Sequence, residues 1–391
     1  MKLGHDLTWI MISVLSMSSR IRDFHIDIPQ VDIDDLHRRL SETRWAPQLP
    51  GGRQRGVPVT QVRELAEYWQ GEFDWRAQES KLNRFPHYMT EIDGLDVHFL
   101  HVRSPEPDAL PLVLNHGWPN SFAEFAEIID LLTDPRAHGG DPAGAFHVIV
   151  PSVPGFGFSA APGETGWSTE QVGRMWVELM DRLGYPRYGV QGGDLGTYVS
   201  TAMAQAAPDR VVGLYITAGL GFPTEADVPT LTDTERAGYQ AMMSADWVNG
   251  VDHHALLRSA PQTFSIGWND SPAGALAWML QKYTDFSASG PLAESIDRDA
   301  LLTTVSLYWF TQSFGSSAWS YYDSTGFAWP TGSDVVPTGV YTGAPGIRRL
   351  AERTAKIVHW PEGNPAGHHF IAMDQPEAYA ADLRLFFSAR A

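Results

Sequence analysis

The chain has 391 residues, with 28 Lys and Arg against 46 Asp and Glu, so its net charge at pH 7 is −18. This excess of negative charge argues against nucleic acids and anionic membranes as partners. Because cysteine is absent, disulfides, thiolate nucleophiles and zinc–thiolate sites are excluded.

An apolar stretch at residues 7–17 opens the chain, but it is too short to span a bilayer. Lys2 precedes it, as in a signal peptide, yet no small-residue cleavage site clearly follows. We interpret residues 1–21 as a disordered extension, with secretion as the alternative, and expect a cytoplasmic protein.

Three short helices are predicted next, where apolar residues recur at helical spacing between loops rich in Gly and Pro: residues 31–40, 59–69 and 75–83. Because these helices precede the strands of the main sheet, we expect residues 22–90 to form a meander on the outside of the main domain.

Strands and helices then alternate over residues 91–218. The pattern predicts a hairpin around Asp93-Gly94, at residues 88–92 and 96–102. Buried strands are expected at 110–115, 146–151, 188–190 and 211–217, with helices at 122–132, 169–183 and 197–206. Such alternation is typical of an α/β fold with a mostly parallel sheet flanked by helices.

The strand signals stop between residues 219 and 333. Helices are expected at 234–247, 253–258, 271–283 and 299–314, in a stretch rich in Trp, Tyr and Phe. A helical insertion between strands of one sheet indicates a cap. The sheet resumes in residues 334–391, with strands at 335–341 and 353–360 and a last helix at 376–388.

A glycine-rich corner at residues 192–196, Gly-Gly-Asp-Leu-Gly, joins a predicted strand to a predicted helix. This is the nucleophile-elbow pattern, with Asp194 where a serine hydrolase has serine. The absent side chains permit a strained, positive-φ corner, and the helix N-terminus behind it favours an anion. A plain strand–glycine–helix turn is the alternative.

Two neighbouring histidines, His368 and His369, follow the last predicted strand and precede the last helix. An α/β-hydrolase presents its catalytic histidine at this place. We predict that one of the two is catalytic, against the alternative of a surface pair.

Taken together, these motifs resemble the epoxide hydrolases of the α/β-hydrolase superfamily, in the branch with an N-terminal epoxide-hydrolase segment. This branch includes the microsomal enzymes and bacterial relatives, some of which act in natural-product pathways. The resemblance covers residues 22–390 and rests on motifs in the family's order: Phe73-Asp-Trp-Arg, Leu82-Asn-Arg-Phe-Pro, His116-Gly-Trp-Pro, Pro154-Gly-Phe-Gly-Phe-Ser, Gly192-Gly-Asp-Leu-Gly, Asn269-Asp-Ser-Pro, Leu307-Tyr-Trp and Gly367-His-His-Phe.

The resemblance implies an α/β-hydrolase fold, no cofactor and no metal. Asp194 would attack an epoxide carbon to form an alkyl–enzyme ester. His369, which directly precedes the Phe, would activate the water that releases a vicinal diol. Backbone N–H groups of Trp118 and Leu195 would hold the oxyanion, and the Trp118-Pro119 bond is expected to be cis.

The sequence departs from the family at the acid that orients the histidine. The loop after the resumed strand, residues 342–349, carries no carboxylate. Glu225 or Asp227, beyond the strand that follows the elbow, could take its place. The alternative, which is weighed equally, is that each is an acid in a loop that faces solvent.

A second departure concerns the two cap tyrosines that activate the epoxide in the family. Tyr321 occupies one position, with Tyr322 as the register-slip alternative. His253, followed by His254, occupies the other. An imidazole that titrates near neutrality can donate a proton, whereas a solvent-facing His pair is the equal alternative.

The remaining expectations concern the substrate. Leu195 replaces a frequent aromatic residue and reshapes the floor of the site. We expect His116 to shape its turn, and we place these residues near the substrate: His116, Trp118, Phe156, Trp268 and Trp309. The function predicted is hydrolysis of a bulky apolar or aromatic epoxide. A catalytically reduced relative that binds an apolar ligand, or that directs ring opening or cyclisation without hydrolysis, is the alternative. Haloalkane dehalogenation comes third, and a homodimer is left open.

Overall fold

The computed structural model describes residues 21–52, 55–217, 219–244, 252–287, 296–323, 330–341, 346–365 and 368–388. The predictions made for residues 1–20 therefore lie outside the described residues. Residues 342–345, part of the loop in which the family carries its acid, also lie outside the described residues.

A nine-stranded sheet forms the centre of the protein, in the order β1-β2-β3-β5-β4-β6-β7-β8-β9. The pairs from β5 through β4 to β9 are parallel, whereas β1, β2 and β3 extend one edge in antiparallel pairing. The mostly parallel sheet is thus confirmed. The strands are β1 (Arg22–Phe24), β2 (His87–Ile92), β3 (Leu95–Val102), β4 (Leu110–Asn115), β5 (Phe146–Pro151), β6 (Tyr188–Gly192), β7 (Val211–Ile216), β8 (Thr338–Val340) and β9 (Ile357–His359).

The predicted hairpin is present as β2 and β3. Its turn residues Asp93 and Gly94 both have positive φ, 51° and 78°, as a two-residue hairpin turn requires. β1 was not predicted. It adds an edge strand from the segment expected to be a purely helical meander.

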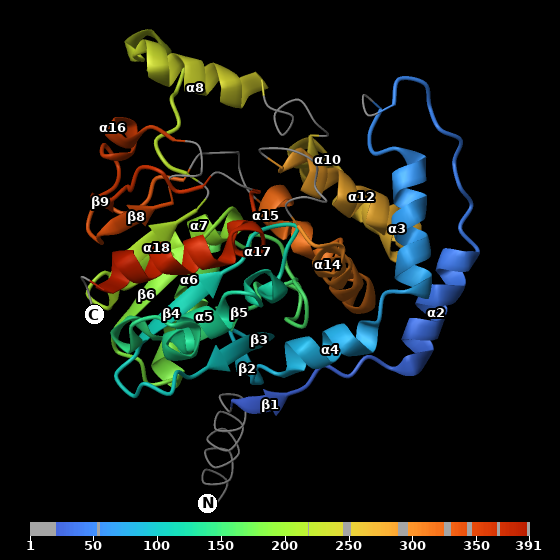
Figure 1. Cartoon of the computed structure of the whole chain (residues 1–391), viewed down its shortest axis with the longest axis horizontal. Coiled ribbons are helices and arrows are strands. Elements are labelled where there is room, and N and C mark those ends of the chain that lie inside the picture. The colour runs from blue at the N-terminus through green and yellow to red at the C-terminus, as the bar shows by residue number, and fades with distance from the viewer. Residues whose placement is uncertain are drawn as a thin grey trace, which may run out of the picture.

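Helices of the main domain flank the sheet (Figure 1). They are α5 (Ile129–Thr133), α6 (Thr169–Arg182), α7 (Leu195–Ala206), α16 (Arg348–Ala351), α17 (Ile371–Asp374) and α18 (Pro376–Ser388), with 3₁₀ turns η1 (Phe122–Phe125), η2 (Pro135–His138) and η3 (Pro142–Gly144). The continuous helix predicted at 122–132 is wrong. The segment divides into η1 and α5 because its backbone makes tighter bonds to the third preceding residue, such as Ile128 N–H to Phe125 O.

The helical insertion predicted between β7 and β8 is present. It comprises η4 (Val228–Thr230), α8 (Asp233–Ser244), α10 (His253–Ser259), α11 (Pro261–Asp270), α12 (Pro272–Asp285), α14 (Arg298–Thr311), η5 (Ser316–Ala318) and α15 (Trp319–Tyr322). Of these, η4, α11, η5 and α15 were not expected. The start of α11 is set by Pro261 at the first helical position, where proline is well tolerated.

The N-terminal helices wrap around the cap helices as well as the main domain. They are α2 (Gln30–Ser41), α3 (Val59–Gly71) and α4 (Trp75–Asn83), and Figure 1 shows α3 lying beside α12. Trp69 Nε1 of α3 donates to Ser306 Oγ of α14 at 3.0 Å. Gln281 of α12 accepts the Val57 N–H at 2.8 Å. The meander therefore fixes the cap in place.

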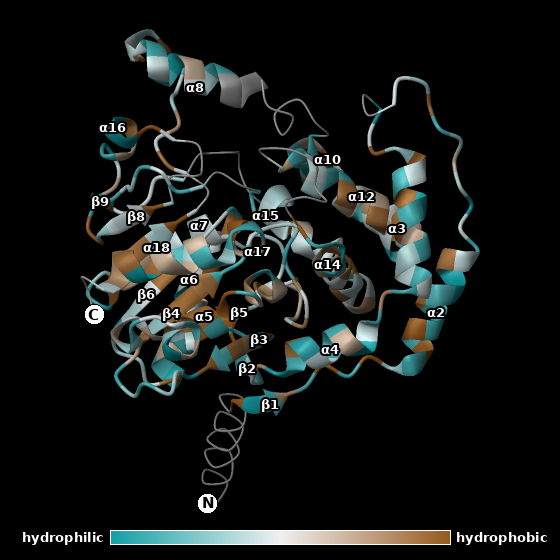
Figure 2. Cartoon of the chain, viewed as in Figure 1, coloured by the Kyte–Doolittle hydropathy of each residue, from teal (hydrophilic) through white to brown (hydrophobic). Residues whose placement is uncertain are grey.

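Hydrophobic residues gather on the central strands and on the helix faces turned toward them (Figure 2). One core cluster runs through all three parts of the chain and includes Trp69 of α3, Trp176 of α6 and Trp319 of α15. In the part of the chain that the structure describes, no helix is both long and apolar enough to cross a bilayer.

Candidate active site

The corner between β6 and α7 presents Asp194 in a strained conformation, with φ 52° and ψ −127°. A Cβ on Gly192 would lie 2.0 Å from the Gly196 carbonyl oxygen, and one on Gly196 would lie 2.1 Å from that of Asn115. Side chains are therefore excluded on both sides of the corner. The positive φ and the flanking glycines agree with the elbow pattern read from the sequence.

The Asp194 carboxylate is held by backbone donors. The Trp118 N–H donates to Asp194 Oδ1 at 3.0 Å, from a turn whose Trp118-Pro119 bond is cis. Burial by itself would raise the pKa of Asp194, but His369 and the N–H groups of Trp118 and Leu195 outweigh it and bring the pKa to about 2. The carboxylate is therefore ionised at neutral pH, as a nucleophile must be.

His369 faces Asp194. Its Nε2 lies 3.4 Å from Asp194 Oδ2, and the two side chains are 27% and 26% exposed, so a small molecule can reach both. The His369 backbone N–H donates to the Phe286 carbonyl at 3.0 Å, and the two rings lie 4.9 Å apart. The end of α12 thus supports the histidine.

The neighbouring His368 is a buried structural residue. Its Nε2 lies 2.7 Å from the Tyr283 carbonyl oxygen, and its Nδ1 accepts the Phe370 N–H at 3.2 Å. Both ring nitrogens are therefore occupied by the backbone, which leaves His369 as the histidine that reaches Asp194.

The two acids proposed to orient His369 lie elsewhere. Asp227 forms an ion pair with Arg353 at 2.5 Å and accepts from both the N–H and the hydroxyl of Thr224, while Glu225 is exposed. Within the described ranges, Asp194 is the only carboxylate in ion-pair contact with His369. Among the described residues, neither Glu225 nor Asp227 forms an ion pair with His369, because an arginine binds Asp227 and Glu225 is exposed.

Aromatic rings from the cap close over Asp194. The His253 ring stacks on Trp118 with centroids 5.3 Å apart and planes 9° from parallel. Tyr321 meets both rings edge-on, at 5.5 and 5.7 Å. His253 and Tyr321 are each 8% exposed, whereas Tyr322 is 38% exposed. The solvent-facing alternative for His253 does not hold, and Tyr321, not Tyr322, lies at the site.

The environment of His253 keeps its imidazole neutral. Burial lowers the pKa of His253 well below its ordinary value, and the neighbouring His254 and Lys282 lower it further. Lys282 is itself buried in an ion pair, 2.6 Å from Asp285 Oδ2. His253 can therefore donate through an N–H of a neutral ring, but not as the imidazolium that the sequence suggested.

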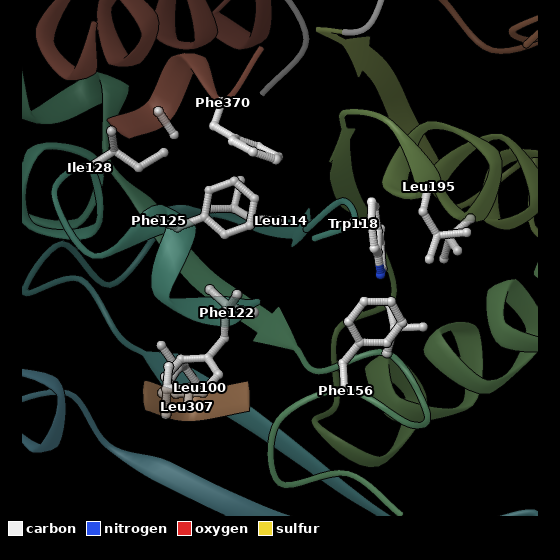
Figure 3. Packing of buried hydrophobic residues seen from close by; sticks show 14 of the residues in the cluster. Leu100, Leu114, Trp118, Phe122, Phe125, Ile128, Phe156, Leu195, Leu307 and Phe370 are labelled. Carbon is white, nitrogen blue, oxygen red and sulfur yellow. The ribbon is translucent and has the colours of Figure 1, made fainter. Parts of the chain in front are cut away.

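The expected substrate contacts divide into two groups. Trp118 and Leu195 lie at Asp194. Phe156 belongs to the same buried cluster and is drawn below Trp118 in Figure 3. Phe156 is completely buried, with its ring 5.0 Å from that of His116. His116 accepts the Val153 N–H at 3.1 Å, so it shapes the core instead of touching a substrate.

The two cap tryptophans differ in place. Trp268 stacks on Trp278 at 5.0 Å, and Trp278 lies 6.0 Å from Trp118. Trp309 lies under the Arg39 guanidinium of α2, 5.9 Å away. The ring of Trp309 thus serves the contact between the cap helices and the N-terminal helices, and its place at the substrate stays a prediction.

Sequence reasoning missed Trp278, Phe286 and Glu124. Glu124 is 7% exposed and accepts the Gly117 N–H, next to the oxyanion donor, at 3.4 Å. An acid two residues into a short helical turn ordinarily faces solvent, so the sequence carried no signal for its burial.

Over the described residues, no group of three His, Asp or Glu side chains is arranged to hold a metal ion.

Comparison with known proteins agrees with this geometry. A model of the epoxide hydrolase N terminus matches residues 21–125, and one of the alpha/beta hydrolase fold matches residues 111–252. A provisionally named epoxide hydrolase of Stigmatella aurantiaca is 40% identical over 376 residues, covering 94% of this chain and 84% of that protein. Epoxide hydrolase 1 of Sus scrofa is 32% identical, covering 94% and 88%.

The fold is shared with solved structures as well. The Aspergillus niger epoxide hydrolase superposes with a TM-score of 0.82 at 27% identity, covering 96% of this chain and 97% of that chain. The chain therefore belongs to the epoxide hydrolases of the α/β-hydrolase superfamily.

Proposed function

We propose that this protein hydrolyses an epoxide to a vicinal diol through an ester formed on Asp194. The observation that carries the proposal is the arrangement of three groups. Asp194 Oδ1 accepts the Trp118 N–H at 3.0 Å, while Oδ2 is free of that bond and lies 3.4 Å from His369 Nε2. One oxygen thus occupies an oxyanion position, and the other is directed toward a base.

In the first step, Asp194 Oδ2 attacks an epoxide carbon and the ring C–O bond breaks. The oxygen that leaves the carbon takes a proton from the Tyr321 hydroxyl on the cap side, while an N–H of the neutral His253 ring donates a hydrogen bond to it. A neutral phenol and a neutral imidazole N–H can both donate hydrogen bonds to this oxygen. An ionised carboxylate needs no base to activate it.

In the second step, His369 takes a proton from water, and the resulting hydroxide attacks Asp194 Cγ. The negative charge that forms on Oδ1 is stabilised by the Trp118 and Leu195 N–H groups. Collapse of this intermediate breaks the ester bond and releases the diol, which takes up the proton held by His369. Hydrolysis leaves a proton on the Asp194 carboxyl group, and this proton passes through solvent to the Tyr321 oxygen that was deprotonated in the first step, so both groups recover their starting states.

Aromatic rings around the site favour an apolar or aromatic epoxide. Trp118, His253 and Tyr321 are in mutual ring contact, and Phe286 joins His253 to His369. Such surfaces bind apolar groups through dispersion and burial. Bulky substituents on the epoxide would therefore contact the cap, with the ring oxygen toward Tyr321 and His253.

The test uses trans-stilbene oxide in ¹⁸O-water. In a single turnover the diol should carry no label, because its new oxygen comes from Asp194. Over many turnovers ¹⁸O should enter the peptide that contains Asp194, as read by mass spectrometry. Asp194→Asn should form no ester.

Label in the first-turnover diol would mean direct attack by water and would contradict the ester. If neither diol nor ester forms with trans-stilbene oxide or smaller epoxides, the catalytically reduced reading would replace this proposal.

A further inference from the structure

A buried carboxyl group that the proposed reaction does not use lies directly behind the oxyanion backbone. Glu124, in η1, is 7% exposed, and its Oε2 accepts the Gly117 N–H at 3.4 Å. No Lys or Arg of the described residues pairs with it. A carboxyl buried without a cation is costly unless it is neutral or well hydrogen-bonded, so its presence at this place calls for a reason.

The contact of Glu124 with Gly117 bears on the nucleophile. A Cβ added to Gly117 would lie 2.7 Å from Asp194 Cβ, so the Gly117 backbone already touches Asp194. The next peptide provides the Trp118 N–H on Asp194 Oδ1. Any shift of Gly117 would therefore displace the oxyanion donor.

The element that carries Glu124 also contacts the histidine side of the site. η1 packs against α17, the helix that begins just after His369. Phe125 of η1 and Phe370, the residue before α17, belong to the same buried cluster, part of which is drawn in Figure 3. The turn η1, which carries Glu124, therefore follows the segment of Trp118 along the chain and packs against the helix that follows His369.

Charged and titratable groups around Glu124 favour its neutral form. Asp194 is the charged neighbour, and the buried phenols of Tyr283, Tyr308 and Tyr379 interact with Glu124 electrostatically. Burial raises the pKa of all three phenols above the ordinary range, so they stay neutral through the range of an enzyme assay.

The titration of Glu124 itself falls within that range. Burial raises its pKa, the Gly117 N–H lowers it, and the negative charge of Asp194 raises it, to about 8 in all. Glu124 is therefore protonated at neutral pH and becomes an anion as the pH rises through about 8.

We propose that Glu124 is a positioning residue that holds the Gly117–Trp118 backbone against Asp194 while neutral and weakens the oxyanion site once ionised. The inference rests on the proposed function, since the oxyanion meant is the one formed during hydrolysis of the Asp194 ester. An anion next to this backbone opposes the negative charge that develops on Asp194 Oδ1. Ester hydrolysis should accordingly slow as the pH rises.

The experiment compares the wild-type protein with Glu124→Gln, which has nearly the same shape, keeps an acceptor oxygen and cannot ionise. Glu127→Gln is the matched control, because Glu127 lies three residues on in a surface ion pair with Lys81. The alkyl–enzyme is loaded with trans-stilbene oxide in single-turnover amounts, and its hydrolysis is followed from pH 6 to 9.5.

In the wild-type protein and Glu127→Gln, hydrolysis should fall about tenfold or more between pH 7 and 9.5, on the scale of a weakened oxyanion donor. Glu124→Gln should keep its neutral-pH rate throughout. A purely structural role would lower the rate at every pH by the same factor, and the fall above pH 8 would persist in Glu124→Gln. That result, or a wild-type profile without the alkaline fall, would overturn the proposal.

A readout that is independent of activity is thermal stability. Because the folded protein holds the Glu124 proton to a higher pH than the unfolded chain, this group's contribution to stability is lost as the pH rises from about 4.5 to about 8. The melting temperature of Glu124→Gln should therefore gain on that of the wild-type protein between pH 6 and pH 9. If the wild-type protein forms no ester at pH 7, the proposed function fails instead, and the melting curves still report on Glu124.

Discussion

His369 Nε2 lies 3.4 Å from Asp194 Oδ2, so the base and the nucleophile of the proposed reaction contact each other directly. No other carboxylate of the described residues forms an ion pair with His369. The Phe286 carbonyl and ring support the histidine instead. Among the described residues, a backbone hydrogen bond to Phe286 and packing against its ring therefore orient His369.

His369→Gln should separate the two half-reactions. Ester formation needs only an ionised Asp194 and a cap donor, so it should proceed. Ester hydrolysis should slow by about 10²–10⁴-fold, the usual contribution of a general base. Mass spectrometry of the intact protein after mixing with trans-stilbene oxide should show a stable adduct. His368→Gln provides the contrast, since it should lower stability without trapping the adduct. Steady turnover by His369→Gln would show that another group activates the water.

The two cap donors should act on ester formation alone. Tyr321→Phe should slow alkylation by about a hundredfold or more, the cost of one oxyanion-type donor, and leave hydrolysis of the preformed ester nearly unchanged. His253→Leu should slow alkylation in the same way as Tyr321→Phe. His253→Gln keeps an N–H donor, so it should retain part of the alkylation rate. Stopped-flow tryptophan fluorescence can follow the alkylation. Equal effects on both half-reactions would indicate a general loss of packing.

The pH profile of alkylation follows from the same residues. The pKa of His253 is held well below its ordinary value, mainly by burial, and the pKa of Asp194 is about 2. Neither group changes its charge between about pH 6 and 8, a range in which an ordinary histidine would titrate. Alkylation should therefore be independent of pH there. A fall in the rate with rising pH that His253→Gln removes would restore the imidazolium hypothesis.

The Asp227–Arg353 ion pair should matter for stability and not for catalysis. Arg353 chiefly, and Thr224 in addition, hold the pKa of Asp227 below its ordinary value. A depressed pKa adds stability that is present above the unfolded pKa, about 3.9, and is lost as the pH falls. Asp227→Ala should thus lower the melting temperature at pH 7, with the difference vanishing in acid. Glu225→Ala should change neither stability nor kinetics. Accumulation of the alkyl–enzyme in Asp227→Ala would show that Asp227 does act on His369.

Gly117→Ala tests how closely the oxyanion backbone and the nucleophile fit. The added Cβ would lie 2.7 Å from Asp194 Cβ, so one of the two segments must move and the Trp118 N–H with it. We expect alkylation and hydrolysis to fall by about a hundredfold each. Gly267→Ala in α11 is the matched control, because its Cβ meets no atom within 4 Å and alanine favours a helix by up to about 1 kcal/mol. Full activity in Gly117→Ala would show that this backbone tolerates movement.

Local chemistry let the sequence determine the elbow, the order of the elements and the place of Asp194 at the corner. A Cβ on Gly192 or on Gly196 would lie 2.0 or 2.1 Å from a backbone carbonyl oxygen, so glycine is required at both positions. Such a steric requirement can be recognised from a few adjacent residues of the sequence. The Asp93-Gly94 hairpin and the alternating strands and helices are likewise set by short-range patterns. Asp194 could therefore be predicted from a few neighbouring residues.

Only the tertiary structure decided what surrounds Asp194. Asp227 was a reasonable partner for His369 by chain order, but folding brings it to Arg353, 126 residues away. Glu124 was unremarkable in the sequence, yet packing buries it behind Gly117. The reason is physical, because burial, charge pairing and ring contact depend on segments that meet only when the cap and the sheet are assembled. The sequence therefore determines the elbow and the position of Asp194 on it, and long-range packing determines the groups that surround Asp194.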